Sequence, residues 1–114
     1  MSEKNHLYVL WTDDNPITAE KMVFMYTVNA MKFKWWEEVT LIIWGASAQL
    51  VSDDVDIQQL IRQAQEAGVT VTACKACADQ LGVTEDLEAL EIDVQYLGIA
   101  LTNLLKGEEA LLTV

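Results

Sequence analysis

The chain is poor in the residues that would tie it to a disulfide scaffold, a nucleic acid or a membrane. Two cysteines are too few for a secreted disulfide framework. Seven Lys and Arg stand against 18 Asp and Glu, and this charge of −11 leaves no basic patch for nucleic acid or an anionic membrane surface. The apolar runs are far shorter than a membrane span, and the N-terminal residues contain no signal-peptide core. These absences predict a cytoplasmic protein without a membrane span or direct nucleic-acid contact.

Motifs for a bound cofactor are also missing. No GxGxxG or Walker sequence occurs among the five glycines. The stretch after the first predicted strand, residues 12–16, contains no glycine, and its carboxylates would repel the phosphate of a flavin. We therefore expect no cofactor.

What the chain does have is an apolar content of 52% and a regular alternation of strand and helix patterns. Alternation with short connections predicts one α/β domain over residues 1–114, doubly wound, with helices on both faces of a mainly parallel five-stranded sheet. This is a three-layer sandwich of the flavodoxin-like or Rossmann-like kind. The predicted strands are 6–11, 39–44, 69–73, 92–97 and 110–114, and the predicted helices cover about 16–34, 54–67, 74–81, a turn from 84, and 99–106.

The first predicted helix carries apolar residues on two opposite sides. At 100° per residue, one stripe contains Ala19, Met22, Val23, Tyr26, Ala30 and Phe33. A helix on a sheet needs only one such stripe. The second stripe is therefore expected to be covered by another subunit; it consists of Phe24, Val28, Met31 and Trp35.

Three loops follow predicted strands, and functional sites of open parallel sheets lie at the carboxyl ends of strands. These loops are residues 12–16, 45–49 and 74–77. Trp11 and Trp44 end two of the strands and can belong either to a pocket or to the core, with the core favoured. Asp13 and Asp14 are interpreted mainly as an acidic turn before a helix. The candidate pocket residues are Thr12, Asp13, Trp44, Gly45, Ser47 and Lys75.

Cys74 is the main candidate for chemistry because it follows a predicted strand and precedes a predicted helix. The N–H groups and the dipole of a helix start favour a thiolate, which is the nucleophilic form of cysteine. Cys77 lies one helical turn further on, close enough to resolve a persulfide or to form a disulfide, and Lys75 adds a local positive charge. The alternative is that both cysteines are small, buried and inert.

Three other sites with similar residues fit the chain poorly. A thioredoxin-like domain needs a cis-proline facing its cysteines, and the single proline, Pro16, lies at a helix start. A zinc site needs four ligands, whereas the two cysteines and His6 supply three, with His6 at the wrong end of the sheet. A receiver domain needs an aspartate after its third strand, where this chain has Cys74.

The segment from Ala73 to Val83, ACKACADQLGV, closely resembles the cysteine segment of DsrE/DsrF-like proteins. Trp44-Gly45-Ala46-Ser47 and the stretch 98–102 (GIALT) resemble other parts of that family, and the order of elements matches over essentially the whole chain. The resemblance implies a homotrimer or homohexamer. It also implies a role in intracellular sulfur metabolism, with sulfur carried as a persulfide and relayed to a partner protein.

In relatives that carry sulfur, the carrier cysteine corresponds to Cys74, and Cys77 matches a second cysteine found in part of the family. The arginine-rich turn of the sulfur-relay members is absent here, which argues against a role in tRNA thiolation. The sequence thus predicts a sulfurtransferase or sulfur carrier acting through Cys74, with Cys77 as an accessory catalytic residue. The alternative is a non-catalytic oligomeric binding module whose thiols line a pocket between subunits.

Overall fold

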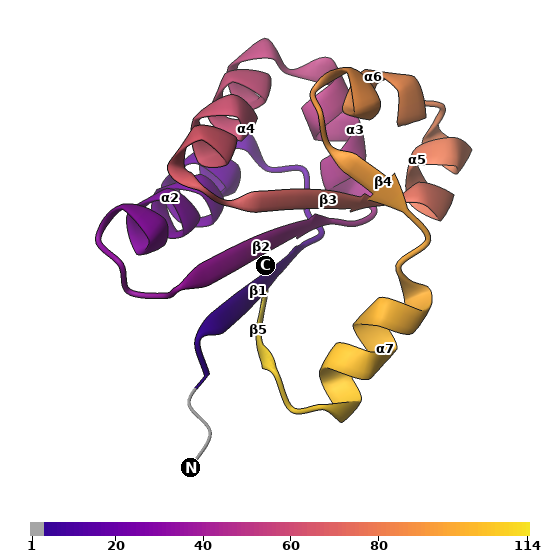
Figure 1. The fold of residues 1–114 in the computed structure, drawn as a ribbon. Helices are drawn as coiled ribbons and strands as arrows, with labels where there is room; N and C mark the ends of the chain where they lie inside the picture. The colour runs from indigo at the N-terminus through magenta and orange to yellow at the C-terminus, as the bar shows by residue number, and fades with distance from the viewer. Residues whose placement is uncertain (1–3) are drawn as a thin grey trace.

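The computed structural model describes residues 4–114 and contains a five-stranded sheet in the order β4-β3-β2-β1-β5. Every neighbouring pair of strands is parallel. Helices lie on both sides of the sheet (Figure 1), so the predicted doubly wound α/β architecture is confirmed. The elements are β1 His6–Trp11, α1 Pro16–Thr18, the π-helix η1 Ala19–Phe24, α2 Met25–Lys32, β2 Glu38–Ile43, α3 Ala46–Asp53, α4 Val55–Ala67, β3 Thr70–Cys74, α5 Lys75–Leu81, α6 Thr84–Ala89, β4 Asp93–Gln95, α7 Gly98–Lys106 and β5 Ala110–Thr113.

The strand order explains why the two faces of the sheet are covered unequally. Strands β1 to β4 are added in one direction, and right-handed crossovers therefore place the helices between them on the same face. The chain then returns past β1 to form β5, which puts α7 on the opposite face (Figure 1). Among residues 4–114, α7 is the one helix on the second face. No helix within residues 4–114 is both long and apolar enough to cross a bilayer.

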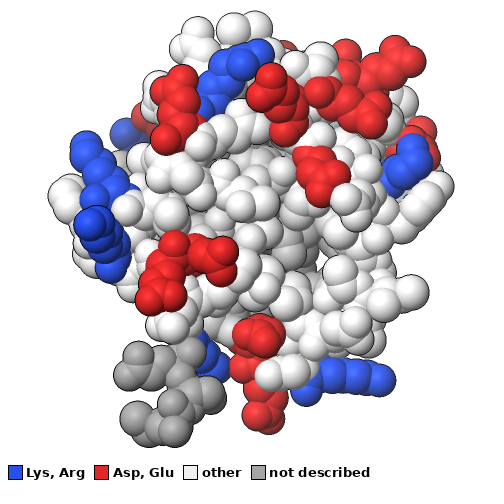
Figure 2. Space-filling model, viewed as in Figure 1, with Lys and Arg blue, Asp and Glu red and all other residues white. Residues whose placement is uncertain are grey.

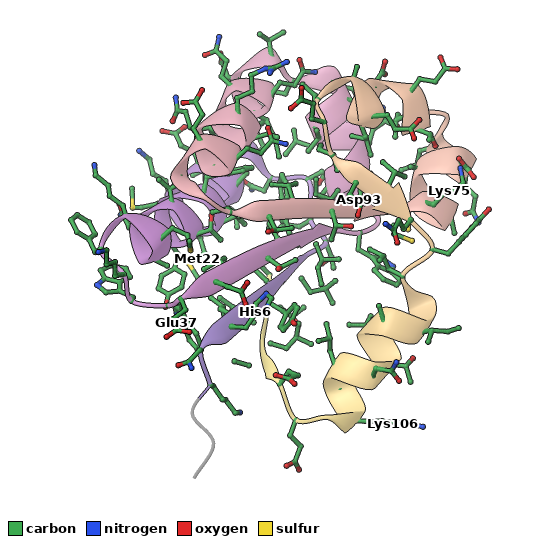
Figure 3. The ribbon with its side chains drawn as sticks, viewed as in Figure 1. His6, Met22, Glu37, Lys75, Asp93 and Lys106 are labelled. Carbon is green, nitrogen blue, oxygen red and sulfur yellow. The ribbon has the colours of Figure 1, made fainter. Side chains whose placement is uncertain are left out.

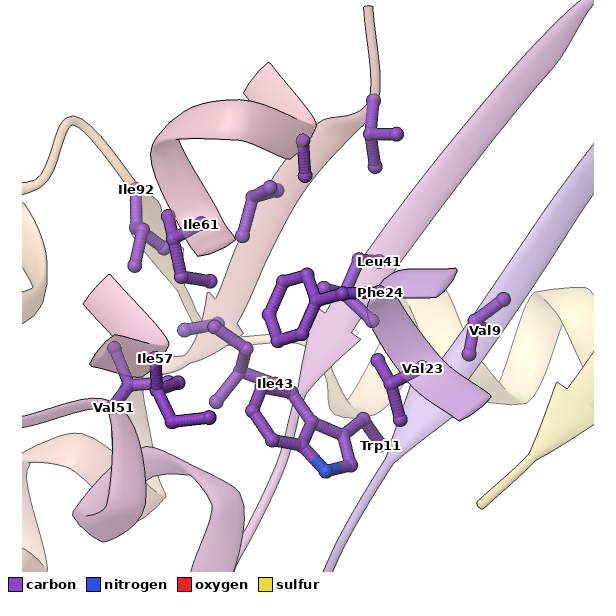
Figure 4. Packing of buried hydrophobic residues seen from close by; sticks show 14 of the residues in the cluster. Val9, Trp11, Val23, Phe24, Leu41, Ile43, Val51, Ile57, Ile61 and Ile92 are labelled. Carbon is purple, nitrogen blue, oxygen red and sulfur yellow. The ribbon is translucent and has the colours of Figure 1, made fainter. Parts of the chain in front are cut away.

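The main core lies between the sheet and the helices of the first face. Residues in register form rows across the strands, such as Val9–Leu41–Val71. Trp11 at the end of β1 is fully buried, as the core interpretation predicts, and its ring meets the Phe24 ring edge-on at 5.4 Å and 83° (Figure 4). An edge-to-face contact of this kind adds to the free energy gained from burying the two rings.

The prediction that a second apolar stripe awaits another subunit is wrong for the middle of the first helix. Phe24 is 2% exposed and belongs to the core, whereas Met22 and Phe33 of the expected inner stripe are exposed. The cause is η1, since a π-helix advances less per residue than the 100° assumed. Val28 and Met31 are half-buried against the core of the same chain, beside α4.

Most element boundaries follow the predicted capping residues. The Asn15 side chain accepts hydrogen bonds from two N–H groups at the start of α1, and Gly68 ends α4 with φ of 101°. Several boundaries differ from the prediction by one or two residues, and two differ by more. Residues 46–49 were expected to form a loop and instead form the first turn of α3. Small residues suit a loop, but alanine also has a high helix propensity, so the sequence did not distinguish the two. Strand β4 is shorter than predicted and covers Asp93–Gln95.

Replacing Phe24 with alanine tests whether the second apolar stripe of the first helix is covered within the chain. We expect Phe24→Ala to lower the free energy of unfolding by about 3–5 kcal/mol, because it removes a fully packed ring. Met25→Ala is the matched control: Met25 is adjacent but 50% exposed, and its loss should change stability by about 0.5 kcal/mol or less. Urea denaturation at several protein concentrations measures both. If Phe24→Ala separated an oligomer into monomers but left the free energy of unfolding unchanged, the assignment of Phe24 to the core would be wrong.

Candidate functional site

The carboxyl ends of β1 and β2 are held together by Ser47, in the first turn of α3. Its hydroxyl is fully buried, donates to the Trp11 carbonyl at 2.6 Å and accepts from the Trp44 N–H at 3.1 Å. The Trp44 N–H also bonds the Trp11 carbonyl at 3.0 Å. The hydroxyl is therefore committed to bonds between neighbouring elements, and Ser47 supports the site without facing a ligand.

Gly45 makes the turn between β2 and α3. Its φ of 72° with ψ of −130° lies in a region that side chains strongly disfavour. A Cβ at this position would meet no atom closer than the Thr12 carbonyl oxygen at 3.8 Å. The need for glycine is therefore conformational: it lets the chain turn directly from the strand into the helix and brings the start of α3 beside α5.

The two cysteines lie at the carboxyl end of β3. Cys74 lies between a strand and a helix, as predicted. It is the last residue of β3 and the N-cap of α5, whereas the prediction ended the strand at Ala73. It is 4% exposed, whereas Cys77 in the first turn of α5 is half-buried. Both are free thiols, and they lie close enough together for Cys74 to raise the pKa of the Cys77 thiol. Of the two thiols, Cys77 is therefore the more accessible to solvent.

A cavity of about 340 Å³ opens beside Cys77, between the start of α3 and α5. The α5 residues spaced three and four positions apart supply one wall, since they lie on the same side of a helix. Sequence reasoning included Gly45 and Cys77 among the site residues but missed the other three lining residues, although the helical spacing from Cys77 could have found two of them. The lining consists of Gly45, Ala46, Cys77, Gln80 and Leu81.

The remaining predicted pocket residues do not line this cavity. Lys75 forms an ion pair with Asp79 at 3.3 Å and lies 5.9 Å from the centre of the Tyr96 ring, on another side of α5. Thr12 donates its hydroxyl to the C-terminal Val114 carbonyl at 3.0 Å. Asp13 is half-buried in the turn after β1, and Trp44 is half-buried at the end of β2.

His6 lies at the start of β1, at the opposite end of the sheet from Lys75 (Figure 3). Its ring hydrogen-bonds the Thr40 hydroxyl at 2.7 Å and lies 3.3 Å from the Glu38 carboxylate. Within residues 4–114, no three His, Cys, Asp or Glu side chains come together in a way that could hold a metal ion.

Burial raises the pKa of the Cys77 thiol above its ordinary value, and the hydrogen bond with Cys74 raises it further. Two backbone N–H groups, those of Gly45 and of Cys77 itself, act in the opposite direction by bonding to its sulfur. Cys77 therefore keeps its proton at neutral pH and can serve as a hydrogen-bond donor to Cys74. The arrangement suits thiol exchange between two adjacent sulfurs.

Removing Cys74 should lower the pKa of Cys77, because the hydrogen bond and the charge of Cys74 both raise it. We expect alkylation of Cys77 in the wild type to reach half its maximal rate above the free-cysteine value of about 8.5. In Cys74→Ala the midpoint should move to lower pH. Thr72→Ala, on the same strand, is the control and should leave the midpoint unchanged. Site-resolved mass spectrometry across pH measures it, and equal midpoints in wild type and Cys74→Ala would refute the coupling.

Comparison with known proteins identifies the fold and the family of the chain. A conserved protein of unknown function, BT1422 from Bacteroides thetaiotaomicron, matches with a TM-score of 0.95 and 38% identity over 96% of this chain and 95% of its own. MTH1491 from Methanobacterium thermoautotrophicum (TM-score 0.67, 16% identity, 98% and 100% covered) and the ychN protein from E. coli (0.61, 18%, 96% and 99%) share the fold. A comparison with curated proteins returned no match. The model of the DsrE/DsrF-like family matches residues 6–114, and the chain belongs to that family.

Proposed function

We propose that this protein accepts sulfane sulfur as a cysteine persulfide and passes it to a thiol of a partner protein, with Cys74 as the carrier. The observation that carries the proposal is the pair of adjacent free thiols at the carboxyl edge of the sheet, in a chain of the DsrE/DsrF-like family. A persulfide forms on a thiolate, and exchange requires a second sulfur within reach. The cytoplasm, where thiols stay reduced, is the compartment in which such a pair remains available.

The burial of Cys74 also supports its role as the sulfur carrier. A persulfide is more reactive than a thiol, so a carrier must shield it from water and from other thiols. At 4% exposed, Cys74 is shielded within the domain itself. We do not propose direct contact with tRNA, because 18 acidic residues would repel its phosphates.

Mass spectrometry of the intact protein after brief incubation with cysteine hydropersulfide tests this function. The wild type should gain the mass of one sulfur atom, and a reducing agent should remove it. The double variant Cys74→Ser/Cys77→Ser should gain none. If the wild type gains no sulfur while its thiols alkylate normally, the sulfur-carrying function is wrong and the thiols belong to a binding module.

We further propose that copies of the chain associate, as a trimer or hexamer, through an apolar surface centred on α7. This α7 surface is defined by Tyr96, Ile99 and Leu105. Ile99 is 80% exposed and Leu105 60% exposed, and α7 has no buried residue in the monomer. Exposed apolar side chains gathered on one element are typical of protein interfaces. A short helix without packing of its own is marginally stable, so a neighbouring copy would supply the missing contacts.

The distribution of charged side chains is consistent with an interface at the α7 surface. Each copy carries a charge of −11, so charged surfaces of two copies repel each other. In the view of Figure 2 most charged side chains lie around the rim, and the surface between α7 and the sheet is largely uncharged. Half-buried apolar residues of the adjoining strands, Tyr8, Leu10 and Leu111, extend this uncharged region.

Charges introduced on α7 should separate the copies. We expect Ile99→Lys/Leu105→Lys to be monomeric in light scattering, because burying two ammonium groups costs more than the contact gains. Val55→Lys is the control: Val55 is an exposed apolar residue at the start of α4, and its change should leave the assembly intact. A monomeric wild type would refute the interface.

A further inference from the structure

The two thiols differ in what can reach them. Cys77 lines the cavity of about 340 Å³, and Cys74 is not among the lining residues. Cys74 is 4% exposed, whereas Cys77, one helical turn further on, is half-buried. A molecule entering the cavity between α3 and α5 therefore meets the sulfur of Cys77 first, with Cys74 behind it.

We propose that Cys77 is the entry thiol of the site, which takes sulfur from a small hydropersulfide in this cavity and hands it to Cys74. The inference rests on the proposed sulfur-carrying function and adds the direction of transfer and the class of donor. It reverses the order expected from sequence, in which Cys74 reacts first and Cys77 only assists.

Both steps are exchanges without net oxidation or reduction. In the first, Cys77 loses its proton to solvent and its thiolate attacks the terminal sulfur of the donor R–S–SH. The donor S–S bond breaks, RS⁻ leaves and takes up a proton, and Cys77–S–SH remains. In the second, the Cys74 thiolate attacks the terminal sulfur of Cys77–S–SH. The Cys77 thiolate leaves and takes the proton that Cys74 has lost, so Cys74–S–SH and Cys77–SH result.

The backbone around Cys77 supports the first step. The backbone N–H groups of Gly45 and of Cys77 itself act to lower the pKa of the Cys77 thiol, and such donors stabilise the thiolate that forms when the proton leaves. Because burial and Cys74 raise the Cys77 pKa, the entry rate should increase with pH through the neutral range.

The cavity also limits the donor. Its lining contains small and apolar residues with one amide and no Lys or Arg, and the nearby Lys75 is paired with Asp79. A dianion such as thiosulfate would enter without a counter-charge, into a protein of charge −11. A small hydropersulfide such as cysteine hydropersulfide carries less negative charge than a dianion and is the class of donor that the cavity fits.

The sequence offers a direct way to follow the sulfur. Lys75 lies between the cysteines, so trypsin leaves Cys74 on the peptide 63–75 and Cys77 on the peptide 76–106. Reduced protein is mixed with cysteine hydropersulfide, quenched with an alkylating agent at short times, digested and analysed by mass spectrometry. In the wild type, the sulfur should be found first on the Cys77 peptide and later on the Cys74 peptide.

The single variants separate the two orders. Cys74→Ser should accumulate persulfide on Cys77, and Cys77→Ser should label Cys74 at least about 10-fold more slowly than the wild type, because the remaining thiol is buried. Wild-type labelling of Cys74 in Cys77→Ser, or first labelling of Cys74 in the wild type, would overturn the entry role and leave the proposed function intact. No sulfur on either peptide of the wild type would overturn the proposed function itself.

Filling the cavity tests the route without touching a thiol. Ala46→Leu, in the cavity wall, should slow labelling of Cys77, whereas Ala89→Leu, at the end of α6 and outside the cavity, should not. Equal rates in these two variants would refute the route. Thiosulfate should label the wild type more slowly than cysteine hydropersulfide, and faster labelling by thiosulfate would refute the donor class.

Discussion

One buried hydrogen bond, from the Ser47 hydroxyl to the Trp11 carbonyl at 2.6 Å, positions most of the candidate site. It joins the end of β1 to the first turn of α3, and the same hydroxyl accepts the Trp44 N–H at the end of β2. Because Ser47 fixes where α3 begins, it also fixes Gly45, which lines the same cavity as Cys77. The environment of Cys77, which follows β3, thus depends on the carboxyl ends of β1 and β2.

The direction in which strands are added governs the rest of the molecule. Strands β1 to β4 progress one way across the sheet, so their crossover helices accumulate on one face and build the main core there. The return to β5 leaves α7 alone on the other face, with Ile99 and Leu105 exposed. An apolar content of 52% is therefore divided between a well-packed core and apolar side chains that α7 leaves exposed.

Local signals predicted much of this fold, because the physics that determines them is local. Asn15 caps α1, and Gly68 and Gly82 end α4 and α5 in the left-handed conformation that glycine tolerates. The π-helix at 19–24 has no such signal. It turns Phe24 toward the core, whereas the prediction of the two stripes assumed an α-helix throughout. The helix start at Ala46 was equally hidden, since alanine fits both a helix and a small-residue loop.

The sequence by itself determined the alternation of elements, the parallel sheet, and the position of Cys74 between a strand and a helix, since these follow from periodicity and caps within short windows. Only the tertiary structure decided which thiol faces a cavity and where apolar surface remains uncovered. The physical reason is that exposure depends on what packs across from a residue. For Cys77 those groups are Gly45 and Ala46, which reach it only when β2 and β3 lie side by side.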